Sequence, residues 1–141
     1  MAALGAAEKN GHPGCREAKE GHAMKLFRFD QGVGRTIDRY GSVHAAISRI
    51  LRTPGAVSIG CIHLGPGGVL GYHPAVVHQL FLVVQGEGWV RGEEESRTPI
   101  RAGQAAFWTA GEGHESGSDS GLVAIVIEGE GLDPDAFMTA M

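Results

Sequence analysis

From residue 24 onward, the chain carries short apolar runs that are separated by glycine or proline every ~8 to 12 residues. Within these runs, apolar and polar positions tend to alternate with the two-residue period of a strand, not with the period of about 3.6 residues of a helix. The clearest runs are 25–29, 57–63, 80–84, 105–108 and 122–127. The pattern predicts an all-β chain folded as a sandwich or a barrel.

Three segments allow more detailed expectations. Residues 43–51 suit either a helix or a strand, and we favour the strand. The run 57–63 predicts a buried strand, in which Cys61 is a small buried apolar residue. The glycines of 86–88 predict a tight bend after a buried strand.

Acidic residues lie in two of the predicted loops. Glu93, Glu94 and Glu95 stand at the tip of a predicted hairpin, whereas Glu112 and Glu115 lie within the loop that precedes the last strand. We expect all five to be exposed, because charged side chains are rarely buried unless they are paired.

The first 23 residues differ from the rest of the chain. They are rich in glycine, glutamate, lysine and histidine and contain almost no large apolar residue, so burial cannot offset the entropy lost on ordering them. We therefore predict a disordered leader at 1–23 and a single β-barrel domain at 24–141. The leader lacks the apolar run of a secretory signal.

Composition narrows the class of protein further. The chain has 141 residues, of which 43% are hydrophobic, which is enough for one domain with a core. A net charge of -4 provides no basic stripe for nucleic acid, and no apolar run is long enough to span a membrane. Two cysteines form neither a disulfide framework nor a zinc ribbon. We expect a cytoplasmic protein that binds a small molecule and neither nucleic acid nor membrane.

Two glycine-bounded histidine patterns lie in the second half of the chain. The first runs from Gly67 past His73 to Gly86, and the second from Gly103 to His114. Each histidine lies where a glycine-marked turn meets an apolar strand. An antiparallel barrel can bring two such side chains into one cavity.

These spacings resemble the two motifs of the cupin superfamily, G-x5-H-x-H-x3/4-E-x6-G and G-x5-P-x-G-x2-H-x3-N. The first motif falls on Gly67, His73, Ala75, Gln79 and Gly86, and the second on Gly103, Thr109, Gly111, His114 and Ser118. The resemblance covers about 67–118 and implies a cupin-like double-stranded β-helix, which is a jelly-roll barrel. It also implies a homodimer, in which a strand such as the one that starts at Met24 covers an edge of the partner.

The resemblance leaves the metal site of the family incomplete. Typical cupins hold a divalent metal with two histidines and a glutamate from the first motif and one histidine from the second. In this chain Ala75 and Gln79 replace two of these ligands, whereas a catalytic metal generally needs three or four strong donors. His78 is the nearest further candidate, although a regular strand would turn it away from Gln79. The candidate ligands for Zn, Fe, Mn or Ni are therefore His73, His78, Gln79 and His114.

Three functions remain open. The first, which asks least of the sequence, is a small-molecule-binding barrel whose pocket is lined by His73, Gln79, Phe81, Trp108 and His114. The second is a divalent-metal-dependent enzyme of the dioxygenase or isomerase type. The third is a metal-free sugar-modifying enzyme with a histidine as general base. That chemistry also needs an oriented His–Asp pair and a facing tyrosine, and Tyr72 is expected to face away from His73.

Overall fold

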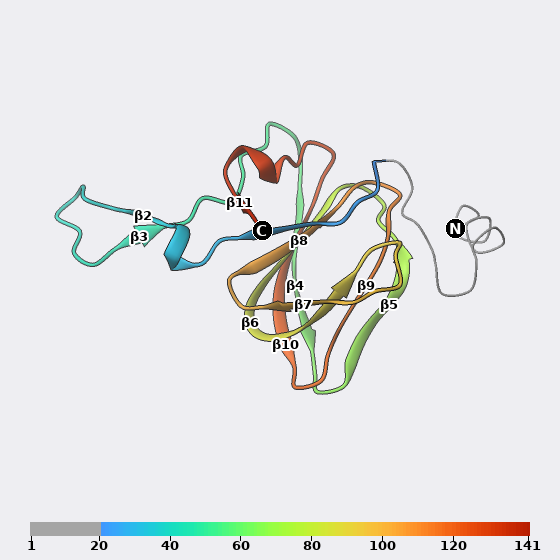
Figure 1. Cartoon of the computed structure of the whole chain (residues 1–141). Helices are drawn as coiled ribbons and strands as arrows, with labels where there is room; N and C mark the ends of the chain where they lie inside the picture. The colour runs from blue at the N-terminus through green and yellow to red at the C-terminus, as the bar shows by residue number, and fades with distance from the viewer. Residues whose placement is uncertain (1–20) are drawn as a thin grey trace.

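The regular structure of the protein is almost entirely β in a computed structural model that describes residues 21–141 (Figure 1). The strands are β1 (Lys25–Arg28), β2 (Arg35–Thr36), β3 (Ala46–Ile47), β4 (Ser58–Leu64), β5 (Gly68–Pro74), β6 (Gln79–Arg91), β7 (Thr98–Arg101), β8 (Gln104–Trp108), β9 (Gly113–Ser118), β10 (Leu122–Glu128) and β11 (Thr139–Ala140). Two short 3-10 helices, η1 (Gln31–Val33) and η2 (Pro134–Ala136), complete the described elements. No helix in residues 21–141 is long and apolar enough to cross a membrane.

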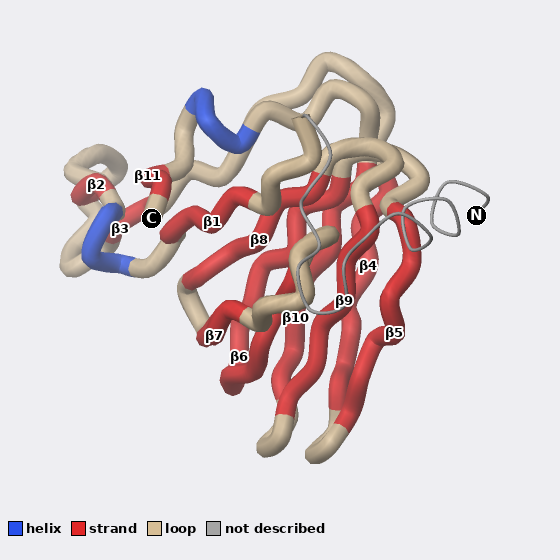
Figure 2. The backbone as a smooth tube through the Cα atoms, turned by 45° about the vertical axis from the view of Figure 1, so that its right-hand side comes forward, coloured by secondary structure: helices blue, strands red, loops and turns tan. Residues whose placement is uncertain are grey.

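The strands are arranged in two antiparallel layers that share the long strand β6 (Figure 2). One layer has the order β11-β1-β8-β6-β10-β4. The other contains β7, the second half of β6, β9 and β5. The all-β prediction is confirmed. Of residues 43–51, which we expected to form a strand, only Ala46–Ile47 does so, in a separate hairpin with β2.

Strand β6 continues through residues 86–88, so the tight bend expected there is wrong. Its first half pairs with β8 and β10, and its second half pairs with β7 and β9. The register against β10 shifts between the pairs Gln85–Val123 and Val83–Ala124, which leaves Val84 as the extra residue of a bulge. Gly86 has a φ of +81°, and a Cβ at this position would overlap the carbonyl oxygen of Gly121. Glycine is therefore needed here because the backbone at the start of β10 approaches β6 closely, and not for a chain reversal.

The bulge decides which side chains of β6 face the barrel interior. Before the bulge, the inward positions are 79, 81 and 83, and after it Val90 is inward. The interior core between the layers contains Phe81, Val83, Val90, Ile100, Ala106, Trp108, Leu122, Ala124 and Val126. A second cluster on the outer face of the larger layer contains Phe27, Leu80, Leu82, Ala105, Phe107, Leu132 and Met138.

Strand β4 is an edge strand, and the expectation that it is buried is wrong. It pairs with β10 alone, and its residues 58–61 and 63 are exposed. Ile59 is 65% exposed, and Cys61 is an exposed free cysteine and not a buried apolar residue. The apolar run resembles that of a central strand, but among the described residues no strand pairs with the free edge of β4.

Candidate functional site

His73 on β5 and His114 on β9 lie directly opposite each other in the smaller layer. Their ring centroids are 4.5 Å apart. The register between the two strands shifts between Leu70 and His73, so a bulge turns His73 toward the same side as His114. Tyr72 faces the other side, as expected, since Arg91 lies over its ring at 4.3 Å.

Each imidazole is oriented by a backbone carbonyl. His114 Nδ1 lies 3.2 Å from the carbonyl oxygen of Glu112, and His73 Nδ1 lies 2.6 Å from that of Gly71. A carbonyl oxygen can only accept, so in the neutral form of either ring the hydrogen is assigned to Nδ1 and the free lone pair to Nε2. Burial lowers the pKa of His114 to about 4, and the neighbouring His73 adds to this effect. His114 is therefore neutral near pH 7.

An aromatic wall continues from His114 into the barrel. The indole of Trp108 stacks on the imidazole of His114 with centroids 4.4 Å apart, and Phe81 meets Trp108 edge-on at 6.0 Å. Gln79 is buried opposite Trp108 in the pairing of β6 with β8. The structure thus places Gln79, Phe81, Trp108 and His114 along one inner wall, with the exposed His73 beside it.

Two ring nitrogens in this wall have no hydrogen-bond partner. Trp108 is 0% exposed and His114 is 1% exposed, yet Trp108 Nε1 and His114 Nε2 are unpaired within residues 21–141. An indole N–H can only donate, and the Nε2 lone pair of this histidine can only accept. Leaving a buried polar group unpaired costs about 1–3 kcal/mol. A molecule that offers one acceptor and one donor would remove this cost.

His78 lies away from His73 and His114. Its Nδ1 accepts a hydrogen bond of 2.9 Å from the backbone N–H of Ala110, and its ring packs 5.8 Å from Phe107, which belongs to the outer cluster. The neighbouring Gln79 faces inward, as the strand period predicts.

The side chains at the family's metal positions do not fit the donor set of a typical cupin metal site. Ala75 is buried and has no donor atom in its side chain. In the part of the chain that the structure describes, no three histidine, cysteine or acidic residues are arranged to hold a metal ion. Two imidazoles and the amide of Gln79 are a weaker set than three or four strong donors. Metal binding by His73, His78, Gln79 and His114 stays a prediction.

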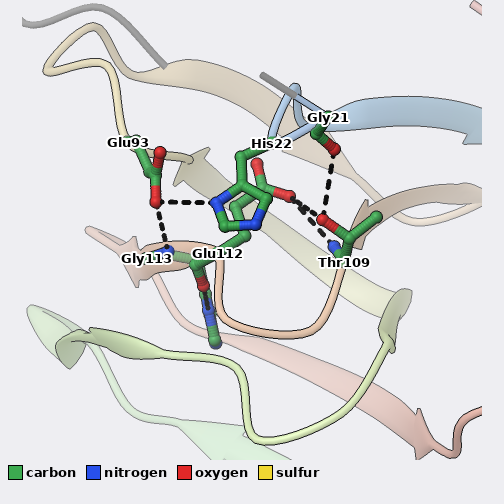
Figure 3. Close-up of polar contacts among 7 residues, drawn as sticks. Gly21, His22, Glu93, Thr109, Glu112 and Gly113 are labelled. Atoms are coloured by element: carbon green, nitrogen blue, oxygen red, sulfur yellow. Dashed lines mark hydrogen bonds and ion pairs between the residues drawn. The ribbon is translucent and has the colours of Figure 1, made fainter. Parts of the chain in front are cut away.

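Two acids that we expected to be exposed are buried beside His114. Glu112 is 0% and Glu93 is 8% exposed. Glu112 accepts a hydrogen bond of 2.9 Å from the N–H of Thr109, and Glu93 accepts one of 3.3 Å from the N–H of Gly113 (Figure 3). Burial raises the pKa of the Glu112 carboxyl, and nearby Glu93 raises it further. The spacing Thr-x-x-Glu, which often marks a side chain that turns back to a backbone N–H, was the one signal for Glu112.

The start of the described chain, residues 21–23, lies against this end of the barrel. His22 Nδ1 lies 3.1 Å from Glu93 Oε2, and Thr109 Oγ1 lies 3.3 Å from the carbonyl oxygen of Gly21 (Figure 3). The leader expected at 1–23 otherwise lies outside the described residues. Its last three residues contact the barrel, and no sequence pattern indicated this.

Comparison with known proteins supports the fold through structure and not through sequence. No protein-family model matches the chain, and no curated protein matches it. A cupin superfamily protein from Desulfitobacterium hafniense has a TM-score of 0.50 at 15% identity, over 75% of this chain and 98% of its own. The chain has the cupin fold.

Two further solved structures are similarly distant from this chain. A conserved protein of unknown function from Streptococcus pyogenes has a TM-score of 0.50 at 15% identity, over 60% of this chain and 74% of its own. An RmlC-like cupin from Shewanella frigidimarina has a TM-score of 0.49 at 21% identity, over 51% of this chain and 64% of its own. At a TM-score of 0.50 and 15% identity, likeness shows the fold and leaves the activity open.

The glycine positions of the cupin motifs explain why the fold is kept while the ligands differ. Gly67, Gly86, Gly103 and Gly111 have φ values of +76°, +81°, +91° and +84°. Residues with a Cβ are disfavoured in this left-handed region, so glycine is the default residue for such turns and close backbone approaches. The motif frame therefore specifies the cupin backbone independently of any metal.

Proposed function

We propose that this cupin barrel binds a small uncharged molecule in its interior, beside Trp108 and His114. The observation that carries the proposal is the pair of buried, unpartnered nitrogens, Trp108 Nε1 and His114 Nε2. Buried polar groups in folded proteins are nearly always paired, and exceptions often mark a binding site or an ordered water.

The chemistry of the wall favours a neutral ligand with both a donor and an acceptor. A hydroxyl group can donate to His114 Nε2 and accept from Trp108 Nε1, and an amide offers the same two functions. Phe81 and Val83 provide apolar contact, while Gln79 adds a further amide. Among residues 21–141 no lysine or arginine is buried, so a buried anion would lack a cationic partner.

Ligand screening tests this proposal directly. The melting temperature would be followed with small polyols, cyclic alcohols and amides, and with carboxylates and phosphates of similar size. We expect stabilisation by a neutral compound. Trp108→Phe keeps an aromatic ring but removes the donor, and we expect it to raise the Kd of that compound about 3- to 10-fold, in line with the net value of one hydrogen bond.

One variant inside the pocket and one outside it distinguish binding in the pocket from nonspecific stabilisation. His114→Ala should abolish the ligand-induced stabilisation, because it removes the acceptor and the stacked ring. His63→Ala, which changes an exposed histidine on β4, should leave it intact. Equal stabilisation of wild type and His114→Ala, or no response to any compound, would contradict the proposal.

A metal-dependent enzyme of the dioxygenase or isomerase type is the second candidate. One observation favours it: both imidazoles hold Nδ1 on a carbonyl and leave Nε2 free, which is the orientation that metal-ligating histidines adopt. The replacement of two family ligands by Ala75 and Gln79 speaks against it. The metal-free sugar-modifying alternative gains no support, since Nδ1 of each imidazole bonds to a backbone carbonyl and not to a carboxylate.

A further inference from the structure

The two layers end in four edge strands, and three of these are protected against pairing with another chain. Strand β11 has only two residues. Strand β7 has four residues and includes Pro99, and β5 contains a bulge and ends at Pro74. Short length, proline and bulges are the usual devices that keep a sheet edge from recruiting a further strand.

Strand β4 has none of these protections. It is seven residues long, with the sequence SIGCIHL, and contains no proline, lysine, arginine, aspartate or glutamate. Its pairing with β10 is regular over all seven residues. The turn at residues 65–67 joins β4 to β5, but these two strands belong to different layers and are not paired.

Part of the exposed surface at β4 is also apolar. Ile59 is 65% exposed, and Val57, just before the strand, is 37% exposed. In the larger layer β4 lies at the end opposite β11 and β1 (Figure 2). An uncharged edge with exposed apolar side chains fits a partner of the same kind.

We propose that β4 is the self-association edge of this protein and pairs with β4 of a second copy in antiparallel orientation. A twofold axis makes such an edge self-complementary. With the pairing centred on Cys61, Ser58 lies opposite Leu64 of the second copy and Ile59 lies opposite His63, so no like charges face each other. Strand β1, which we had expected to cover a partner, is already paired with β8 and β11 in its own chain.

The small contact area of this edge limits the affinity of the dimer. Stable interfaces bury about 800 Å² on each partner, which is more than one strand edge and its flanking side chains supply. We therefore infer a weak dimer that forms with rising concentration. This association is independent of the interior site proposed above.

Sedimentation of the full chain tests the proposal. We expect the mass to rise from 14.8 kDa toward twice that value between low and high micromolar concentration. Cys61→Lys places two like charges opposite each other at the twofold axis and should raise the Kd of the dimer at least about tenfold. Cys61 is exposed, so the monomer should fold normally, which circular dichroism and melting would verify.

The matched control changes an exposed apolar residue away from the edge. Val76 is 86% exposed and lies in the loop after β5, so Val76→Lys should dimerise as the wild type does. A wild type that stays monomeric at high micromolar concentration would overturn the proposal. So would a Cys61→Lys variant that dimerises as tightly as the wild type.

Oxidative crosslinking tests the register separately, in a Cys15→Ser background. Directly opposed residues have Cα atoms about 4.5–5.5 Å apart, which is within disulfide range, so Cys61 should crosslink to its copy. With Cys61→Ser and Ser58→Cys, the two new thiols would lie about 20 Å apart, and crosslinking should be lost. Equal crosslinking at both positions would contradict the pairing.

Discussion

At the scale of single residues, the environment of His114 explains both its protonation state and why its Nε2 is available to a ligand. Its Nδ1 bonds to the Glu112 carbonyl, its face stacks on Trp108, and its Nε2 is buried without a partner. Burial therefore favours the neutral ring, which keeps a lone pair available inside the barrel.

The lowered pKa of His114 predicts acid sensitivity. Its pKa falls from 6.5 to about 4 in the folded protein, so the unfolded chain takes up a proton first as the pH drops. The free energy of unfolding should fall between pH 6.5 and 4 by as much as about 3 kcal/mol from this group, and the group should contribute no pH dependence above pH 7. Urea unfolding of wild type and His114→Asn at several pH values measures the difference. The same acid slope in both proteins would contradict this assignment, and His63→Asn is the control.

Several site residues could be placed from the sequence, and others could not. The motif frame and the two-residue period placed Gln79, Phe81 and His114 on the barrel interior. Glu93 could not be placed, because its burial depends on contacts with Gly113 and His22, which are distant in the chain. Short-range patterns do not contain such contacts.

At the scale of elements, two bulges change which side chains face the barrel interior. Residues an odd number of positions apart face opposite sides of a regular strand. Strict alternation would therefore place His73 opposite to Leu70, and Val90 opposite to Val83. The bulge in β5 and the extra Val84 in β6 each change the inward-facing parity by one residue. A bulge depends on the partner strand, so the pattern of one strand does not reveal it.

Two glycine substitutions should separate close strand packing from strand flexibility. Gly86→Ala introduces a Cβ that overlaps Gly121 at a positive φ, and we expect it to lower the free energy of unfolding by about 3 kcal/mol. Gly60→Ala, in β4, meets nothing within 4 Å and should change stability by less than about 1 kcal/mol. Urea unfolding at low protein concentration compares the two. Similar losses in both variants would show that glycine matters at these positions for reasons other than the close approach of β10 to Gly86.

At the scale of the whole molecule, the fold follows from local signals, but the covering of its surfaces does not. The strand period is local in sequence and predicted an all-β sandwich or barrel, and the resemblance of two short motifs to those of cupins implied the cupin barrel. Whether an apolar strand is covered depends on its position in the sheet order. Strand β4 therefore looked like a core strand and lies at an edge, while residues 21–23 looked unstructured and contact the barrel.

Metal binding also depends on which side chains the fold brings together, and we predict it to be weak. The folded chain brings together two imidazoles and no third strong donor within residues 21–141. Protein purified without a metal-affinity step should therefore contain less than about 0.1 equivalent of Zn, Fe, Mn or Ni per chain by elemental analysis. Content near one equivalent would contradict the prediction and favour the metal-dependent enzyme.

A double variant shows whether the donor set alone limits metal binding. Ala75→His with Gln79→Glu restores the two ligands that typical cupins have at these positions, on a backbone whose frame glycines are unchanged. We expect this variant to take up close to one equivalent of metal and to melt at a higher temperature with added Zn than without it. Val76→His with Gln85→Glu adds the same two side chains at exposed positions, and should gain neither. If the restored variant also stayed metal-free, the positions of His73 and His114, and not the missing ligands, would be what keeps metal out of this barrel.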